Sequence, residues 1–380
     1  MDTCISLSSS VSFSRCRSTF ISSNENTPGA TGIRSFIIRR TIVAQKAPVS
    51  RKVREEMPVG RFGNNGQFEY YRVDYRNDEE LADFCSRCLL VINVAGPSFE
   101  IRDKIAMEAL KNHCHYMDIG GYDLLPELLE SYRGKIENRN LCFVTGAGWM
   151  PGISGVFSKA VIETHMDHPE KTEFTIYYGA VDNWSYASAY DLVASSTGEV
   201  RSYTYSYGER KAISPFRHTH TVLFPFIGHK KICMPLFGAE LSRLALSLKQ
   251  IRNLSVFVMI NDYVSMGKFM SLRLFYRNRM DRAIRMLQKD YRRLVKKENK
   301  WGSVVCRVSE AGRDADRYYY LYTHSNLLWT ALPAVLATQY ILKGKVKSGL
   351  NCLCDAVDCQ SFMSDLNAYG IKYRCYEQKK

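Results

Sequence analysis

The segment from His115 to Asp123 gathers side chains that can transfer a proton. It contains His115, Tyr116, Asp118, Tyr122 and Asp123. Imidazole, carboxyl and phenol groups act as general acids or bases when their pKa lies within reach of neutrality. Tyr122 and Asp123 follow a pair of glycines and should face a cleft, so we assign them as the candidate catalytic residues. His115 lies inside a predicted strand, where a core histidine with a satisfied hydrogen bond is favoured.

Three turns that contain glycine or proline lie around this cluster in the sequence. Glycine lets a ligand approach the backbone closely and adopts positive φ without steric cost. Proline suits the first turn of a helix, and the backbone amides of that turn attract anionic groups. The alternative is that the turns merely connect strands to helices; three turns on one sheet edge favour a ligand site. The three turns are residues 95–97, 120–123 and 146–152. The candidate ligand-binding residues in the first and third turns are Ala95, Gly96, Pro97, Gly148, Pro151 and Gly152.

The elements that must position these residues alternate between strand and helix. Residues 89–94 are continuously apolar and β-branched, which is typical of a parallel strand buried on both faces. Such alternation predicts a doubly wound parallel sheet, in which ligands bind at the carboxyl ends of the strands. Further strands are predicted at 68–73, 115–119 and 141–145, with helices at 77–85, 101–111 and 126–136.

The pattern changes after Gly152. Several strands follow one another without regular helices between them, which predicts a second, mostly antiparallel sheet. A long helical segment at 268–300 and an apolar helix at 325–342 complete the chain. The predicted strands are 173–178, 201–207, 222–225, 254–260, 303–308 and 318–323, after a helix at 154–164.

Residues 89–162 resemble the saccharopine dehydrogenase-like family of nicotinamide oxidoreductases. The segments that carry the resemblance are VINVAGPS, HCHYMDIGGYD and GAGWMPGISG, in that order and at similar separations, with weaker similarity in SPFRHTHTVLFPFIG and LPAVLATQYILKGKV. The resemblance implies a Rossmann-like sheet with a second α+β substrate domain, and hydride exchange with an imine, carbonyl or amine of a small molecule. It makes the turn residues above candidate cofactor-binding residues, and it allows a homodimer.

This resemblance suggests a division of the chain into four parts. Residues 1–23 are rich in serine and are expected to be unstructured. Residues 24–152 would form the dinucleotide-binding domain and 153–324 the substrate and dimerisation domain. Residues 325–380 would supply a C-terminal helix and tail that return to the first domain.

The glycine loop of the dinucleotide site departs from the family pattern. Gly29, Thr31 and Gly32 are assigned to the cofactor, but Ser35 replaces the third glycine, the best preceding strand (18–23) is weak, and the following helix (33–40) is short. The alternative is therefore a non-catalytic relative that acts as a binding protein. The strand at 41–44 is followed by Lys46 and no carboxylate, which favours NADP over NAD.

Two further residues matter for the cofactor and the substrate. Asp74, which follows the third predicted strand, is also assigned to the cofactor site. In saccharopine-forming relatives a carboxylate precedes the proline of the third turn, whereas this chain has Met150 there. The resemblance thus disfavours saccharopine itself as the substrate, and Trp149 and Met150 either floor a more apolar pocket or pack the domain junction.

The net charge of +14 is concentrated in one place. Residues 268–300 hold twelve of the 52 Lys and Arg residues and three of the 38 acids. A nucleic acid or an anionic membrane surface could bind such a segment. A solvated helix with its apolar residues packed inward is favoured, and no specific nucleic-acid partner is expected.

Metal binding and membrane insertion find little support in the sequence. Neither Cys85-x-x-Cys88 nor the cysteines at 352, 354 and 359 have a convincing second half of a zinc site. His218 and His220 would share one face of a strand but lack a third ligand. We therefore expect no metal, reduced thiols and a cytoplasmic protein. No uncharged apolar run is long enough to predict a membrane span.

Overall fold

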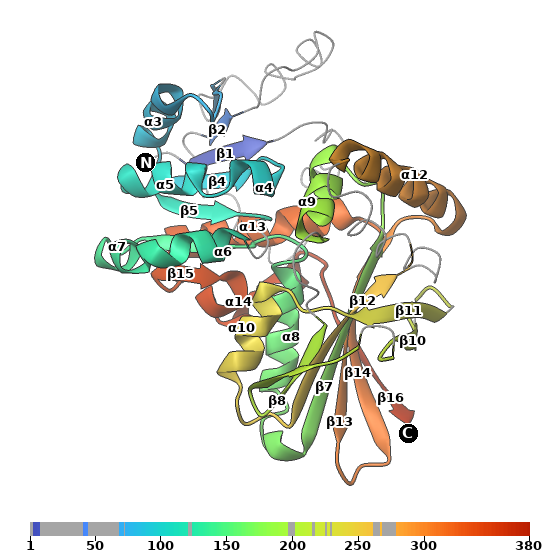
Figure 1. Ribbon diagram of the computed structural model, residues 1–380. Coiled ribbons are helices and arrows are strands. Elements are labelled where there is room, and N and C mark those ends of the chain that lie inside the picture. Colours follow the sequence, from blue (N-terminus) through green and yellow to red (C-terminus); the bar gives the residue numbers. More distant parts are fainter. Residues whose placement is uncertain are drawn as a thin grey trace, which may run out of the picture.

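The computed structural model places the residues on two sheets (Figure 1). The residues that it describes are 3–7, 41–44, 68–71, 73–120, 124–196, 202–214, 217–224, 226–228, 230–260, 267 and 279–380.

The first sheet is parallel and contains seven strands from the described residues. Their spatial order is β3-β2-β1-β4-β5-β6-β15. The first six follow the strand order of a dinucleotide-binding Rossmann sheet, and the chain's late strand adds a seventh at one edge. The strands are β1 (Thr3–Leu7), β2 (Thr41–Ala44), β3 (Phe68–Tyr70), β4 (Leu90–Val94), β5 (His115–Asp118), β6 (Cys142–Thr145) and β15 (Gly349–Cys352).

Helices cover both faces of this sheet because alternate strand residues point to opposite faces. Val91, Tyr116 and Phe143 pack into one cluster with the helices that precede β6. Leu90 and Met117 pack into the cluster on the other face. The first face is covered by α3 (Asp78–Ser86), α5 (Lys104–Lys111), α6 (Leu124–Leu129) and α7 (Arg133–Asn138), with the short α4 (Ser98–Ile101) before α5 and a single turn at Glu130–Tyr132. The second is covered by α8 (Ile153–Glu163), α13 (Asn326–Leu342), α14 (Leu353–Ala356) and α15 (Cys359–Ala368).

Two local predictions for this sheet differ from the structure. The central strand β1 is Thr3–Leu7, so the expectation that residues 1–23 are unstructured is wrong for these five residues. The predicted strand at 18–23 lies outside the described residues. The predicted helix at 101–111 is divided into α4 and α5 because Arg102 has a φ of 55°, which ends the first helical turn.

The second sheet is mostly antiparallel, as predicted. Its main path is β10-β11-β12-β7-β13-β14-β16, with β8 pairing to β12 and β9 to β8; among these pairs only β7 and β12 run parallel. The strands are β7 (Thr172–Val181), β8 (Tyr203–Ser206), β9 (Glu209–Ala212), β10 (His220–Leu223), β11 (Lys230–Pro235), β12 (Asn253–Ile260), β13 (Trp301–Glu310), β14 (Ala315–Thr323) and β16 (Arg374–Lys379). Its helices are α9 (Tyr186–Ser196), α10 (Ala239–Ser247) and α12 (Met280–Glu298), with a short turn at Pro169–Lys171.

The C-terminal segment serves both sheets. After α13, strand β15 pairs with β6 in the first sheet. The expectation that the whole tail returns to the first domain is wrong for β16, which pairs with β14 of the second sheet. Without β16, strand β14 would leave backbone N–H and C=O groups unpaired at the edge of the sheet. The backbone of β16 pairs with these groups. Because the side chains of β16 are polar, the sequence there lacks the apolar pattern that would predict a strand.

The apolar helix α13 belongs to the core. Trp329, Leu332 and Leu336 are buried in the cluster beneath the first sheet. Among the described residues, no helix combines the length and the apolar character that crossing a membrane requires.

Candidate active site at the carboxyl edge of the parallel sheet

The carboxyl ends of β4, β5 and β6 bring the three predicted turns together. Strand order reverses between β1 and β4, which opens the crevice where such sheets bind ligands. The turns pack directly on one another: a Cβ added at Gly120 would lie 3.2 Å from the hydroxyl of Ser98. One added at Gly148 would lie 2.3 Å from the carbonyl oxygen of Ile119. The contact between neighbouring turns therefore requires glycine at position 148 and leaves little room for a side chain at position 120.

A buried polar residue lies at the last or the next-to-last position of each of the neighbouring strands β4, β5, β6 and β15. Asn93 of β4 accepts a hydrogen bond from the Ala95 amide at 3.0 Å. Asp118 of β5 accepts one from the Gly146 amide at 2.8 Å. These side chains fix the first residues of the loops that follow the strands. The four residues are Asn93, Asp118, Thr145 and Asn351.

Asp118 is a buried acid at the end of β5, and its pKa is strongly shifted. Its side chain is 2% exposed. Burial raises its pKa to about 7, and the hydrogen bond from Gly146 opposes this rise only in part. A carboxyl group that titrates near neutrality can hold or release a proton during catalysis. The sequence placed Asp118 in the polar cluster but gave preference to Tyr122 and Asp123; its position as the last residue of an apolar strand was the signal for burial.

The turn after β4 is held by the second domain. The carboxylate of Asp191, on α9, accepts hydrogen bonds from the amides of Ser98 at 2.9 Å and Phe99 at 3.1 Å. A Cβ added at Gly96 would lie 2.9 Å from the Cβ of Ala187 on the same helix. Helix α9 thus sits directly on the turn.

The turn after β6 is held in a similar way by α10. Glu240 accepts hydrogen bonds from the Gly152 amide and the Ser154 hydroxyl, both at 2.9 Å. Burial raises the pKa of Glu240 to about 8. The Gly152 amide at the start of α8, which the sequence predicted to attract an anionic ligand group, therefore already binds Glu240 of the same chain. Cofactor contacts by Gly148, Pro151 and Gly152 stay a prediction, and so do those of Ala95, Gly96 and Pro97.

The comparisons with known proteins rest on structure alone. No protein-family model and no curated protein matches the sequence. Among solved structures, saccharopine dehydrogenase (L-Glu forming) from Saccharomyces cerevisiae superposes with a TM-score of 0.63 and 14% identity, over 99% of this chain and 100% of that chain. The chain has a saccharopine dehydrogenase-like fold. Weaker matches include an oxidoreductase from Thermotoga maritima, with a TM-score of 0.42 and 9% identity over 97% of this chain and 95% of that chain.

The saccharopine dehydrogenase-like fold agrees with the family that the sequence segments resemble. Several of the predicted site residues lie outside the described residues. These are the catalytic candidates Tyr122 and Asp123 and the cofactor candidates Gly29, Thr31, Gly32 and Lys46.

Asp74 and Trp149 have partners that the sequence did not reveal. The carboxylate of Asp74 accepts two hydrogen bonds from the Arg76 guanidinium, at 2.9 and 2.7 Å. The indole of Trp149 donates a hydrogen bond to Asn326 of α13 at 3.1 Å and packs against Trp329. The indole also lies beside Gly302 of β13, where an added Cβ would be 2.9 Å from the indole nitrogen. Trp149 therefore packs between α13 and the second sheet, in agreement with one of its two predicted roles.

Two histidines that the sequence singled out, His115 and His220, have structural partners. His115 accepts a hydrogen bond from the Cys142 amide at 3.0 Å, and burial lowers its pKa, as expected of a core histidine. His220 lies 2.8 Å from the Tyr177 hydroxyl and stacks on Phe257. The part of the chain that the structure describes contains no group of three metal-ligating side chains.

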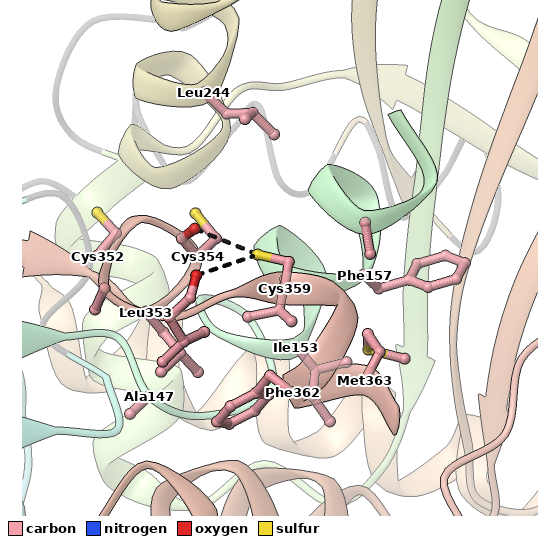
Figure 2. Close-up of a cluster of buried hydrophobic side chains, with 14 of the residues drawn as sticks. Ala147, Ile153, Phe157, Leu244, Cys352, Leu353, Cys354, Cys359, Phe362 and Met363 are labelled. Carbon is pink, nitrogen blue, oxygen red and sulfur yellow. Dashed lines mark hydrogen bonds between the residues drawn. The ribbon is translucent and has the colours of Figure 1, made fainter. Parts of the chain in front are cut away.

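Buried thiols surround the start of α15. Figure 2 shows the sulfur atoms of Cys352, Cys354 and Cys359 among apolar side chains, with Cys359 donating to the Cys354 carbonyl at 3.3 Å. Burial raises the pKa of Cys352 and of Cys359 to about 12, so both are inert thiols. Among the described residues nine cysteines are free, but Cys88 is disulfide-bonded, so the expectation of reduced thiols is wrong at that residue.

The basic segment forms the amphipathic helix α12 over its described part. Ala283, Ile284 and Leu287 are buried against α9, and the basic residues are exposed. This arrangement matches the favoured interpretation of a solvated helix with its apolar residues packed inward.

Proposed function

We propose that the protein is an NADP(H)-dependent oxidoreductase of the saccharopine dehydrogenase-like type. It transfers hydride between the nicotinamide and an imine or carbonyl carbon of an amino-acid-like or biosynthetic intermediate, or oxidises the corresponding amine. The similarity over 99% of this chain and 100% of the yeast saccharopine dehydrogenase carries the proposal, because both sheets have counterparts there. The substrate is a small molecule, and a homodimer remains part of the proposal.

The carboxyl edge of the parallel sheet fits a dinucleotide. The crevice between β1 and β4 is bordered by Ala95, a small, partly exposed residue. When bound there, the cofactor supplies the hydride chemistry, and the protein orients the reacting groups. We assign Gly29, Thr31 and Gly32 to the pyrophosphate. The 2′-phosphate is assigned to Lys46, and Asp74, Gly96, Pro97, Gly148, Pro151 and Gly152 complete the proposed cofactor site.

Proton transfer is assigned to the last residue of β5 and to two residues that follow the strand. We propose Tyr122 and Asp123 as the catalytic pair and add Asp118, which is buried two residues before Gly120. With a pKa of about 7, Asp118 can exchange a proton at neutral pH. The substitution of Met150 for the family's carboxylate supports a substrate other than saccharopine.

Thermal stabilisation by nucleotide tests the cofactor assignment. A ligand at a hundred times its Kd stabilises a folded protein by about 2.7 kcal/mol. We expect NADPH to raise the melting temperature more than NADH at equal concentration, because Lys46 would pair with the 2′-phosphate. Absence of stabilisation by either nucleotide contradicts the proposal, and tighter NADH binding contradicts the NADP assignment.

Turnover tests the catalytic assignment. NADPH oxidation is followed with α-keto acids paired with amines, which form imines in solution. Tyr122→Phe and Asp123→Asn should each reduce turnover at least tenfold, because general acid–base catalysis typically contributes about 10² to 10⁴. Wild-type rates in both variants exclude a role in proton transfer, provided that the variants melt within a few degrees of the wild type.

A further inference from the structure

The carboxylate of Asp191 joins two distant segments of the chain. It lies on α9 of the second domain, and its two oxygens accept one amide each, from Ser98 and Phe99 at the start of α4. The side chain is 4% exposed. Burying a carboxylate is costly unless it is hydrogen-bonded, so these two contacts are what makes this burial tolerable.

The same helix also contacts the turn through the methyl group of Ala187. Ala187 lies one helical turn before Asp191 and leaves room only for glycine at position 96. The turn 95–98 is therefore held from two sides, by close packing at Gly96 and by a charged acceptor at Ser98. Figure 1 shows α9 between α4 and α12, and α9 packs against both.

The neighbouring turn has an independent counterpart. Glu240 of α10 accepts from Gly152 and Ser154 at the start of α8, and a Cβ at Gly155 would lie 2.3 Å from its carboxyl carbon. Both acidic side chains come from the second domain, and both contact turns of the same sheet edge. The second domain thus sets the shape of that edge.

We propose that Asp191 is a positioning residue that holds the turn 95–98 in the conformation that nucleotide binding requires. Its effect on nucleotide affinity rests on the proposed function. Its effect on the turn does not, because the contacts are complete without a ligand. Asp191 acts through the Ser98 and Phe99 amides and does not itself touch the nucleotide.

The decisive variant is Asp191→Asn in the full chain. Asparagine keeps the size of the side chain but has one acceptor oxygen, so its NH₂ group faces one of the two amides that the carboxylate accepted. Loss of a side-chain cap typically changes a local equilibrium by about five- to tenfold. We expect hydrogen–deuterium exchange in a peptide covering 95–101 to accelerate by about that factor without nucleotide. Exchange in β13 and the melting temperature should stay near wild type.

Nucleotide affinity is measured on the same variant by NADPH fluorescence. A turn that is competent in a smaller fraction of molecules weakens binding by that fraction, so we expect a Kd about five- to tenfold higher. Asp167→Asn is the control, because Asp167 is an exposed carboxylate in the connection after α8. It should change neither exchange nor affinity.

Each outcome decides the proposal. Unchanged exchange at 95–101 in Asp191→Asn overturns it, and so does faster exchange with unchanged NADPH affinity. Accelerated exchange throughout the protein assigns Asp191 to general stability and also overturns it. If Asp191→Asn misfolds, Ala187→Leu, which crowds Gly96 without removing the carboxylate, must loosen the same peptide. If the wild type binds no NADPH, the proposed function fails, and the exchange measurement alone decides whether Asp191 holds the turn.

Discussion

Replacing Glu240 by glutamine should change how the stability of this protein depends on pH. Glu240 is 6% exposed, and its carboxyl group accepts from the Gly152 amide and the Ser154 hydroxyl. Burial raises its pKa from the ordinary 4.5 to about 8. The folded protein therefore keeps a proton on Glu240 in a range where the unfolded chain has lost it. Glutamine resembles the protonated acid, since its oxygen can accept from Gly152 and its NH₂ can donate to Ser154.

The difference between the folded and unfolded pKa values of Glu240 sets the sign and the size of the change in the free energy of unfolding with pH. The unfolded chain loses this proton as the pH rises past about 4.5, whereas the folded protein keeps it up to about 8. The free energy of unfolding therefore falls between these values and levels off above them. At about 1.36 kcal/mol for each pKa unit, the full difference is about 5 kcal/mol. Local relaxation lowers the effective cost of a buried charge, so we expect a loss of a few kcal/mol in the wild type.

Urea denaturation at pH 5, 6.5 and 8.5 measures this loss. Wild type and Glu240→Gln should have similar stability at pH 5, and the variant should be the more stable protein at pH 8.5. The exposed Glu170→Gln is the control and should follow the wild type. Asp118, whose pKa is raised to about 7, adds a slope of the same sign to all three proteins. A Glu240→Gln protein that is destabilised equally at every pH contradicts the reasoning, because Glu240 would then be charged in the folded state throughout.

Three further predictions concern single residues. Asp118→Asn should keep the hydrogen bond from Gly146 and the fold but reduce NADPH-dependent turnover at least tenfold, a loss within the range of acid–base catalysis; unchanged initial rates exclude Asp118 from proton transfer. Gly155→Ala should lower the free energy of unfolding, measured by urea denaturation, by about 1–3 kcal/mol, because the new Cβ would lie 2.3 Å from the carboxyl carbon of Glu240. Gly134→Ala is its control and should be neutral or stabilising, because a Cβ there would meet no atom within 4 Å. Lys46→Glu should weaken NADPH binding at least tenfold, a little over 1.4 kcal/mol, and leave NADH binding unchanged in fluorescence titrations; equal loss for both nucleotides contradicts a 2′-phosphate contact.

The sequence predicted the parallel sheet well where its strands are apolar and their turns contain glycine. Residues 89–94 gave β4 to within one residue, and the change of pattern after Gly152 marked the start of the second sheet. Strand β1 was missed because Thr3–Leu7 is followed by a serine-rich stretch with no recognisable turn or helix. Strand β16 was missed because an exposed edge strand needs no apolar face.

The candidate site was predicted less completely than the fold. The turns that meet at the sheet edge could be found from glycine, proline and strand order. Asp191 and Glu240 could not, because each lies about ninety positions from its partner in the sequence, and an isolated acid on a helix is more often exposed. The sequence identified Asp118 as one of the side chains that can transfer a proton. Its raised pKa could not be predicted, because it depends on burial in the packed structure.

The last two strands of the chain have a consequence for its synthesis. Strand β15 pairs with β6, and β16 pairs with β14, so each sheet waits for residues beyond 348 to complete an edge. A ribosome-bound chain that has emerged only as far as α13 presents two bare strand edges to the cell, and such edges recruit other unpaired strands. We therefore expect a chain that stops before residue 349 to expose both of these edges and to aggregate.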